Sequence, residues 1–160
     1  MLTLKQFYNK YVHQRTSFKT AAKILDTFWP YMKPVPGANG ESVNWLNYKT
    51  GIRHIFFRTD VGRQQAFIRI ELRHPQVAQR MQCYQQFVAL KKLLQNTGGN
   101  EWHWQPNATD ESGQAINLIS QTLNGVNALD EADWPAIISF LKVRMLQLDA
   151  FWELVKAGFE

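Results

Sequence analysis

The sequence has little that would mark a secreted, membrane-embedded or disulfide-bonded protein. It contains a single cysteine, Cys83, so no disulfide can form within the chain. No stretch approaches the roughly 18 consecutive apolar residues that cross a membrane. The first residues lack the apolar run and the cleavage site of a signal peptide. We therefore expect a cytoplasmic protein that makes no use of a membrane.

Familiar catalytic and cofactor-binding motifs are also missing. There is no phosphate-binding loop, dinucleotide fingerprint or nucleophile elbow, and the stretch from Gly37 to Gly40 lacks the Lys-Ser/Thr that would follow in a nucleotide loop. The four histidines and Cys83 do not have the spacing of metal ligands. Cys83 lies near the apolar stripe of its expected helix, which favours a buried structural thiol over a nucleophile. We therefore expect no cofactor and no metal, and we favour a domain that is not an enzyme.

What the chain does contain is enough apolar material for one folded domain. Of its 160 residues, 45% are hydrophobic and 13% aromatic, and a chain of this length buries a sizeable core. No repeat or second domain is visible, so we expect a single domain over residues 1–160.

Alternating side chains predict a sheet. In the predicted strand at residues 65–72, Ala66, Ile68, Ile70 and Leu72 share one face. Phe67, Arg69 and Glu71 belong to the other face, and Arg73, directly after the strand, continues it. A hairpin turn is expected over residues 60–63. The predicted strands cover residues 42–48, 52–59, 65–72, 101–105 and 114–123.

Helical spacing appears in three places. It covers residues 3–29, residues 74–96, and a long last helix that Asp130 or Asp133 caps. The last helix carries a heptad-like seam from Trp134 to Val155. The sequence thus predicts an α+β fold, in which a mainly antiparallel sheet of about five strands packs against an N-terminal, a middle and a long C-terminal helix. Residues 33–44 hold two prolines and two glycines and form either a functional loop or a plain connection.

The charge is unevenly distributed. Residues 1–92 hold 15 Lys and Arg against four acids, a net of +11, and residues 93–160 have a net of −6. Such asymmetry is typical of a polyanion-binding face, and it also allows one half of a fold to neutralise the other. We favour the second interpretation.

Asp60 followed by Glu71-Leu72-Arg73 imitates the metal site of restriction-type nucleases, which place an Asp and a Glu-x-Lys on neighbouring strands. Two features oppose this interpretation. Asp60 is expected in a hairpin turn, and arginine replaces the lysine and cannot deprotonate to act as a base. We favour a strand glutamate paired with cross-strand cations.

A cross-strand ladder accounts for the same residues. If Arg58 pairs with Phe67, then Phe56 faces Arg69 and His54 faces Glu71. An open face that mixes rings and arginines also suits single-stranded nucleic acid, although the consensus of RNA-recognition sheets is absent. The nucleic-acid-binding residues predicted on this basis are Lys49, Arg53, Phe56, Arg58, Phe67, Arg69 and Arg73.

Four stretches, which begin at Tyr31, Asn44, His54 and Asp133, resemble an uncharacterised bacterial family, domain of unknown function 4268. The resemblance covers about residues 18–160 and leaves 1–17 as an extension. Members of this family occur alone and appended to nuclease-like proteins. The resemblance implies no cofactor and no established active site. Because related domains are joined to nuclease-like proteins, it favours a role in nucleic-acid binding or in defence.

The function therefore stays unknown at this level, with three hypotheses in order. The first is a non-catalytic binding or accessory domain that contacts protein or nucleic acid. The second is a divergent metal-dependent nuclease. The third is an interaction module that forms a homodimer through the last helix.

Overall fold

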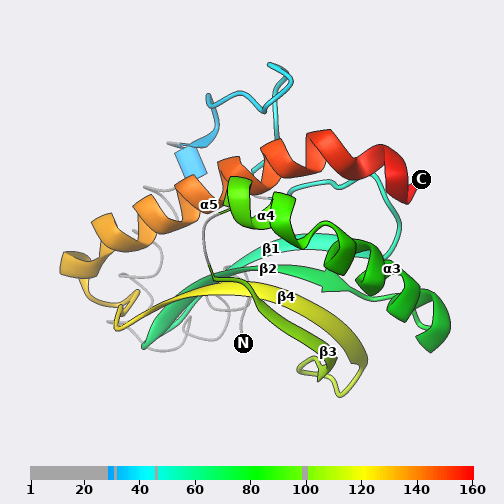
Figure 1. Ribbon diagram of the computed structural model, residues 1–160. Helices are drawn as coiled ribbons and strands as arrows, with labels where there is room; N and C mark the ends of the chain where they lie inside the picture. Colours follow the sequence, from blue (N-terminus) through cyan, green and yellow to red (C-terminus); the bar gives the residue numbers. More distant parts are fainter. Residues whose placement is uncertain (1–28, 31, 46, 99–100) are drawn as a thin grey trace.

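The computed structural model describes residues 29–30, 32–45, 47–98 and 101–160. In this part of the chain a four-stranded antiparallel sheet carries helices on one of its faces (Figure 1). The strands lie in the order β1-β2-β4-β3, so β1 and β3 form the two edges. Their bounds are β1 Ile55–Val61, β2 Gln65–Leu72, β3 His103–Thr109 and β4 Ala115–Asn124.

The helices follow the strands in a simple order. After β2 come α3 (Val77–Ala89) and α4 (Lys91–Gly98), and after β4 comes the long α5 (Trp134–Val155). Two short 3-10 helices, η1 (Glu131–Asp133) and η2 (Lys156–Phe159), flank α5. Within the described residues no helix is long and apolar enough to cross a membrane.

The apolar face of β2 forms the centre of the core, as its alternation predicts. Ala66, Ile68, Ile70 and Leu72 are at most 1% exposed, and α5 and α3 pack on this strand.

The predicted long last helix is also confirmed, and its apolar seam packs inside the domain. Its buried residues face the sheet and α4, and they include Ile137, Leu141, Met145, Leu148, Phe151 and Trp152. The seam is therefore occupied by the domain's own core and is not free for a second copy.

The strand predicted at residues 42–48 is wrong. The described residues of this stretch are irregular and dock on α5 through one buried carboxylate. Asp149 accepts hydrogen bonds from the Tyr48 hydroxyl (2.5 Å) and the Ala38 amide (2.7 Å), and the Trp152 indole donates to the Thr50 carbonyl (2.8 Å). The apolar residues that resembled a strand, such as Trp45, pack a loop against the core instead. In the part of the chain that the structure describes, the sheet therefore has four strands and not five.

Other boundaries differ for local reasons. The second predicted strand begins only at Ile55, because His54 has a φ of 69° and interrupts an extended chain. The middle helix divides at Leu90, whose amide donates to the Phe87 carbonyl instead of continuing the helix. The strand predicted at residues 65–72 is β2, and the one predicted at 114–123 is β4. The strand predicted at 101–105 corresponds to β3, which lies a few residues further towards the C-terminus. The helix predicted at 3–29 lies outside the described residues, apart from its last residue.

Candidate functional site

The candidate site is the sheet face that points away from the helices. The register places Phe56 opposite Glu71, Arg58 opposite Arg69, and Asp60 opposite Phe67. The predicted pairing of Arg58 with Phe67 is therefore wrong by two residues. The cause is the turn: β1 continues through Asp60 to Val61, and the chain reverses only over residues 62–64. Asp60 is accordingly a strand residue and not a turn residue.

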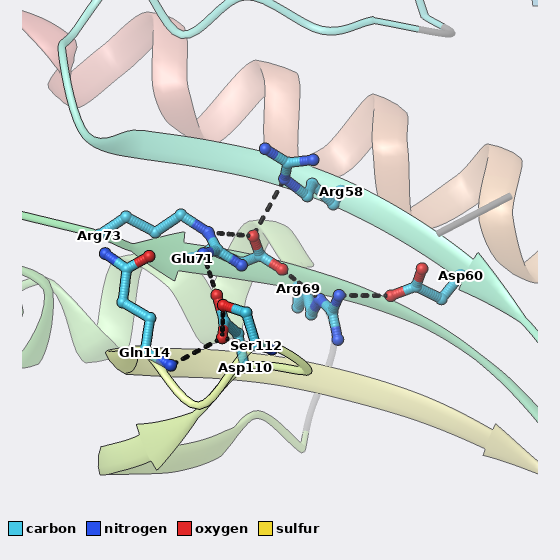
Figure 2. Close-up of polar contacts among 8 residues, drawn as sticks. All are labelled: Arg58, Asp60, Arg69, Glu71, Arg73, Asp110, Ser112 and Gln114. Atoms are coloured by element: carbon cyan, nitrogen blue, oxygen red, sulfur yellow. Dashed lines mark hydrogen bonds and ion pairs between the residues drawn. The ribbon is translucent and has the colours of Figure 1, made fainter. Parts of the chain in front are cut away.

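Glu71 is the centre of this face. Its carboxylate is fully buried and forms ion pairs with three guanidinium groups (Figure 2). The distances are 3.0 Å to Arg58 Nε, 2.6 Å to Arg69 Nε and 2.8 Å to Arg73 Nε. Only the pair with Arg73 also has the geometry of a hydrogen bond. A buried carboxylate is stable only when cations surround it, and here β1, β2 and the residue that follows β2 supply them.

Arg69 joins Glu71 to the second buried acid of this face. Its Nη2 lies 3.0 Å from Asp60 Oδ2, and the Asp60 side chain is fully buried. Neither carboxylate oxygen of Asp60 has a hydrogen bond within the described part of the chain. Burial outweighs the attraction of Arg69 and raises the pKa of Asp60 to about 7. Asp60 therefore titrates near neutral pH.

Arg73 connects the network to the turn between β3 and β4. Its Nη1 lies 2.7 Å from Asp110 Oδ2. Asp110 also accepts hydrogen bonds from the backbone amides of Ser112 and Gln114 and from the Ser112 hydroxyl, so it holds the turn together (Figure 2). Arg73, and then these donors, lower the pKa of Asp110 far below its ordinary value. This ion pair joins the basic first half of the sequence to the acidic second half.

The positions of Asp60 and Glu71 speak against a shared metal ion. One guanidinium, that of Arg69, lies between the two carboxylates and contacts both. Among the described residues, no group of three acidic, histidine or cysteine side chains is arranged to hold a metal. The residues that imitate a nuclease motif are thus built into an ion-pair network.

This face is not an open sheet surface. A cavity of about 690 Å³ lies over it, lined by Arg58, Arg69 and Arg73 and by polar residues of β3 and β4. Phe67 is only 3% exposed, so its ring is not available for stacking in this conformation. At the β1 edge the situation differs, because Phe56 is 36% exposed and the Arg58 side chain 38%.

The structure brings five of the seven predicted binding residues together. These five lie on one face of β1 and β2: Phe56, Arg58, Phe67, Arg69 and Arg73. The other two, Lys49 and Arg53, are exposed in the segment that precedes β1, outside the large cavity.

Sequence reasoning missed Asp110 as a partner of Arg73. The turn itself was readable from Asp110, Ser112 and Gly113, which are typical turn residues. Its contact with Arg73 depends on the strand order, because the β3–β4 turn reaches Arg73 only when β4 pairs with β2.

Fold and site together define an α+β domain in which the sheet face opposite α3 and α5 carries a network of arginines and acids. The particular family follows from the sequence: the model of DUF4268, a domain of unknown function, matches residues 14–156. The chain belongs to this family. No curated protein and no solved structure matches it. The match begins four residues before the predicted start at residue 18.

Proposed function

We propose that this domain is a non-catalytic binding module that holds single-stranded nucleic acid along the edge strand β1. The observation that carries the proposal is the pair of Phe56 and Arg58. The Arg58 guanidinium lies 4.8 Å from the centre of the Phe56 ring, and both side chains are more than a third exposed. A base stacks on an exposed ring or guanidinium plane, and a guanidinium pairs with the neighbouring phosphate.

The buried network positions Arg58 for this role. In the part of the chain that the structure describes, Glu71 engages only the Nε of Arg58, which leaves both Nη groups for a phosphate. Arg69 and Arg73 are already paired with Glu71, Asp60 and Asp110, so they hold Glu71 in place instead of binding the ligand. Lys49 and Arg53 extend the positive charge into the segment before β1.

A non-catalytic role is supported by the same contacts. Metal-dependent cleavage needs carboxylates that converge on a shared cation, and Arg69 occupies the space between Asp60 and Glu71. Arg73 keeps its proton at any ordinary pH and supplies no general base. Asp60 and Glu71 are buried at the centre of the network, so their carboxylates do not contact a bound nucleic-acid strand.

The test is fluorescence anisotropy with a labelled single-stranded oligonucleotide at two salt concentrations. Arg58→Ala should lower the affinity and reduce the salt slope by about one, because one phosphate contact is lost. Phe56→Ala should cost about 1–3 kcal/mol of binding and leave the slope nearly unchanged, because stacking releases no counterions.

Lys92→Ala is the matched control, because Lys92 is an exposed cation of α4 on the helical side of the sheet. This variant should bind like the wild type. Absence of binding at low salt, or equal losses in all three variants, would exclude the β1 edge as a nucleic-acid site and leave a protein partner as the hypothesis to test.

A further inference from the structure

A second cavity lies on the helical side of the sheet, where the segment before β1 meets α3 and η2. Its volume is about 300 Å³. Polar and ionisable side chains dominate its lining, in contrast to the apolar core beside it. Those that bear on its chemistry are Arg53, His54, His74, Arg80, Cys83 and Glu160.

Arg80 is the unusual residue of this cavity. It is only 3% exposed, yet the groups it contacts are neutral. Its Nε donates to Asn117 Oδ1 at 3.2 Å, and its Nη1 donates to the His74 carbonyl at 3.0 Å. No ion pair joins it to a carboxylate of the described residues. Buried guanidinium groups are normally accompanied by an anion, so this charge lacks a counter-ion while it borders a cavity of suitable size.

Two histidines stand at the same cavity. Their rings are 4.7 Å apart between centroids and meet edge to face. His74 Nδ1 accepts the amide hydrogen of Gln76 at 3.1 Å, so the neutral ring carries its proton on Nε2 and donates from there.

His54 is held in a backbone conformation that favours glycine. Its φ is 69°, and it is the only non-glycine residue of the described chain with a positive φ. Such backbone strain is costly and is concentrated at binding and catalytic sites. An imidazole at a position whose backbone favours glycine points to a role that glycine could not fill.

We infer that this cavity binds a small oxyanion, a phosphate or a small phosphate monoester, with Arg80 as the buried counter-charge and His54 and His74 as hydrogen-bond donors. Arg53 adds a positive charge at the rim, and Glu160 is the acid that lines the cavity and opposes the ligand. The site shares Arg53 with the charge proposed to extend the β1 edge, but it contains neither Phe56 nor Arg58, the pair that carries that proposal. The two proposals can therefore be tested separately.

Binding should be linked to protonation of His54. Burial, together with the charges of His74 and Arg53, lowers the pKa of His54, and a bound anion acts in the opposite direction. Cys83 does not contribute near neutral pH, because burial raises the pKa of its thiol to about 11. Affinity should therefore increase as the pH falls. Sulfate is the appropriate probe here, because it remains a dianion across this range.

The experiment is isothermal titration calorimetry of the full chain with inorganic phosphate, sulfate and phosphoserine. The key variant is His54→Gly, which removes the imidazole and relieves the strained φ, so it should unfold at a higher temperature than the wild type. We expect it to bind phosphate at least tenfold more weakly. Because this variant is expected to be the more stable protein, weaker binding cannot come from unfolding.

Glu160→Gln serves as the opposing variant, and we expect it to bind phosphate more tightly because it removes the negative charge of this side chain from the lining. Tighter binding of phosphoserine than of inorganic phosphate would assign a monoester as the ligand, and the reverse order would assign the free anion. Two results would overturn the inference: no binding of any of the three anions at millimolar concentration, or unchanged phosphate affinity in His54→Gly.

Discussion

Both faces of strand β2 are buried, and they are buried by opposite chemistry. On β2, Ile68 and Ile70 lie under the helices at 1% and 0% exposure, and Glu71, on the other face, is also 0% exposed. The helical face is closed by apolar packing, which is non-directional and tolerates exchange of similar volumes. The other face is closed by ion pairs, in which each charge depends on its partner's position. Burial therefore does not distinguish the faces, whereas tolerance to substitution should.

The largest effect is expected on the apolar face. Ile68→Asp places a carboxylate in the apolar core, where Ile68 is 1% exposed, so the free energy of unfolding should fall by at least about 4 kcal/mol, or the variant should fail to fold. Urea denaturation measures this loss. Ile68→Val is the control and should cost about 1 kcal/mol, as the loss of one buried methylene does. An unchanged urea midpoint for Ile68→Asp would show that the face is not the core.

On the charged face, Glu71→Gln should be the most destabilising single substitution. It leaves three guanidinium groups without their shared anion, and removal of one member of a buried ion pair costs about 3–5 kcal/mol. The double variant Glu71→Gln/Arg69→Met should lose less than the sum of its parts, because the two residues are coupled. Strict additivity in urea denaturation would argue against a connected network.

The pH dependence of stability should separate the two faces further. The pKa of Asp60 is raised from 3.8 to about 7 in the folded protein, so the folded state binds this proton more tightly than the unfolded state. Its contribution to stability is complete below about pH 4 and declines as the pH rises towards 7. Between pH 5 and pH 8 the wild type should therefore lose up to about 3 kcal/mol relative to Asp60→Asn. Parallel stability curves for the two proteins would contradict a raised pKa.

The smallest effect should come from the exposed rim of the network. Arg58→Ala removes a partner whose side chain is 38% exposed, and Glu71 retains Arg69 and Arg73. Its cost should stay below about 1 kcal/mol, as is usual for solvent-screened ion pairs. A loss as large as that of Glu71→Gln would place Arg58 inside the network. A small loss confirms that this variant is folded and suitable for the binding experiment.

Some residues in the stretches that resemble the family make contacts that hold the fold together. The stretch that begins at Asn44 contains Tyr48 and Thr50, which attach the irregular loop to α5 through Asp149 and Trp152. It also contains Trp45, whose indole donates to the Val35 carbonyl within the loop. The stretch that begins at His54 contributes the strained histidine and β1. Part of the family pattern thus has a structural explanation.

Much of the architecture was determined by the sequence alone. The alternation in residues 65–72 and the spacing of α5 predict elements and buried faces correctly, because periodicity is a local property of the chain. Residues 114–123 form the predicted strand, but its core face carries Ile119, and Ile116 and Leu118 lie on the charged face. The predicted strand at 42–48 failed for the same reason: apolar residues at alternate positions pack a loop as readily as a strand. The class of fold, the mixed character of the β2 face and the candidate residues Phe56, Arg58, Phe67, Arg69 and Arg73 all followed from local pattern.

Only the tertiary structure decided which charges meet. A shift of two residues in the β1–β2 register replaced the expected pairing of His54 with Glu71 by the contact of Glu71 with three arginines. The β2–β4 pairing brought Asp110 to Arg73 across 37 residues of sequence. Ion pairs depend on distances of a few ångströms between strands, which are set by the turn length and the strand order, and no periodicity within one strand records either of them.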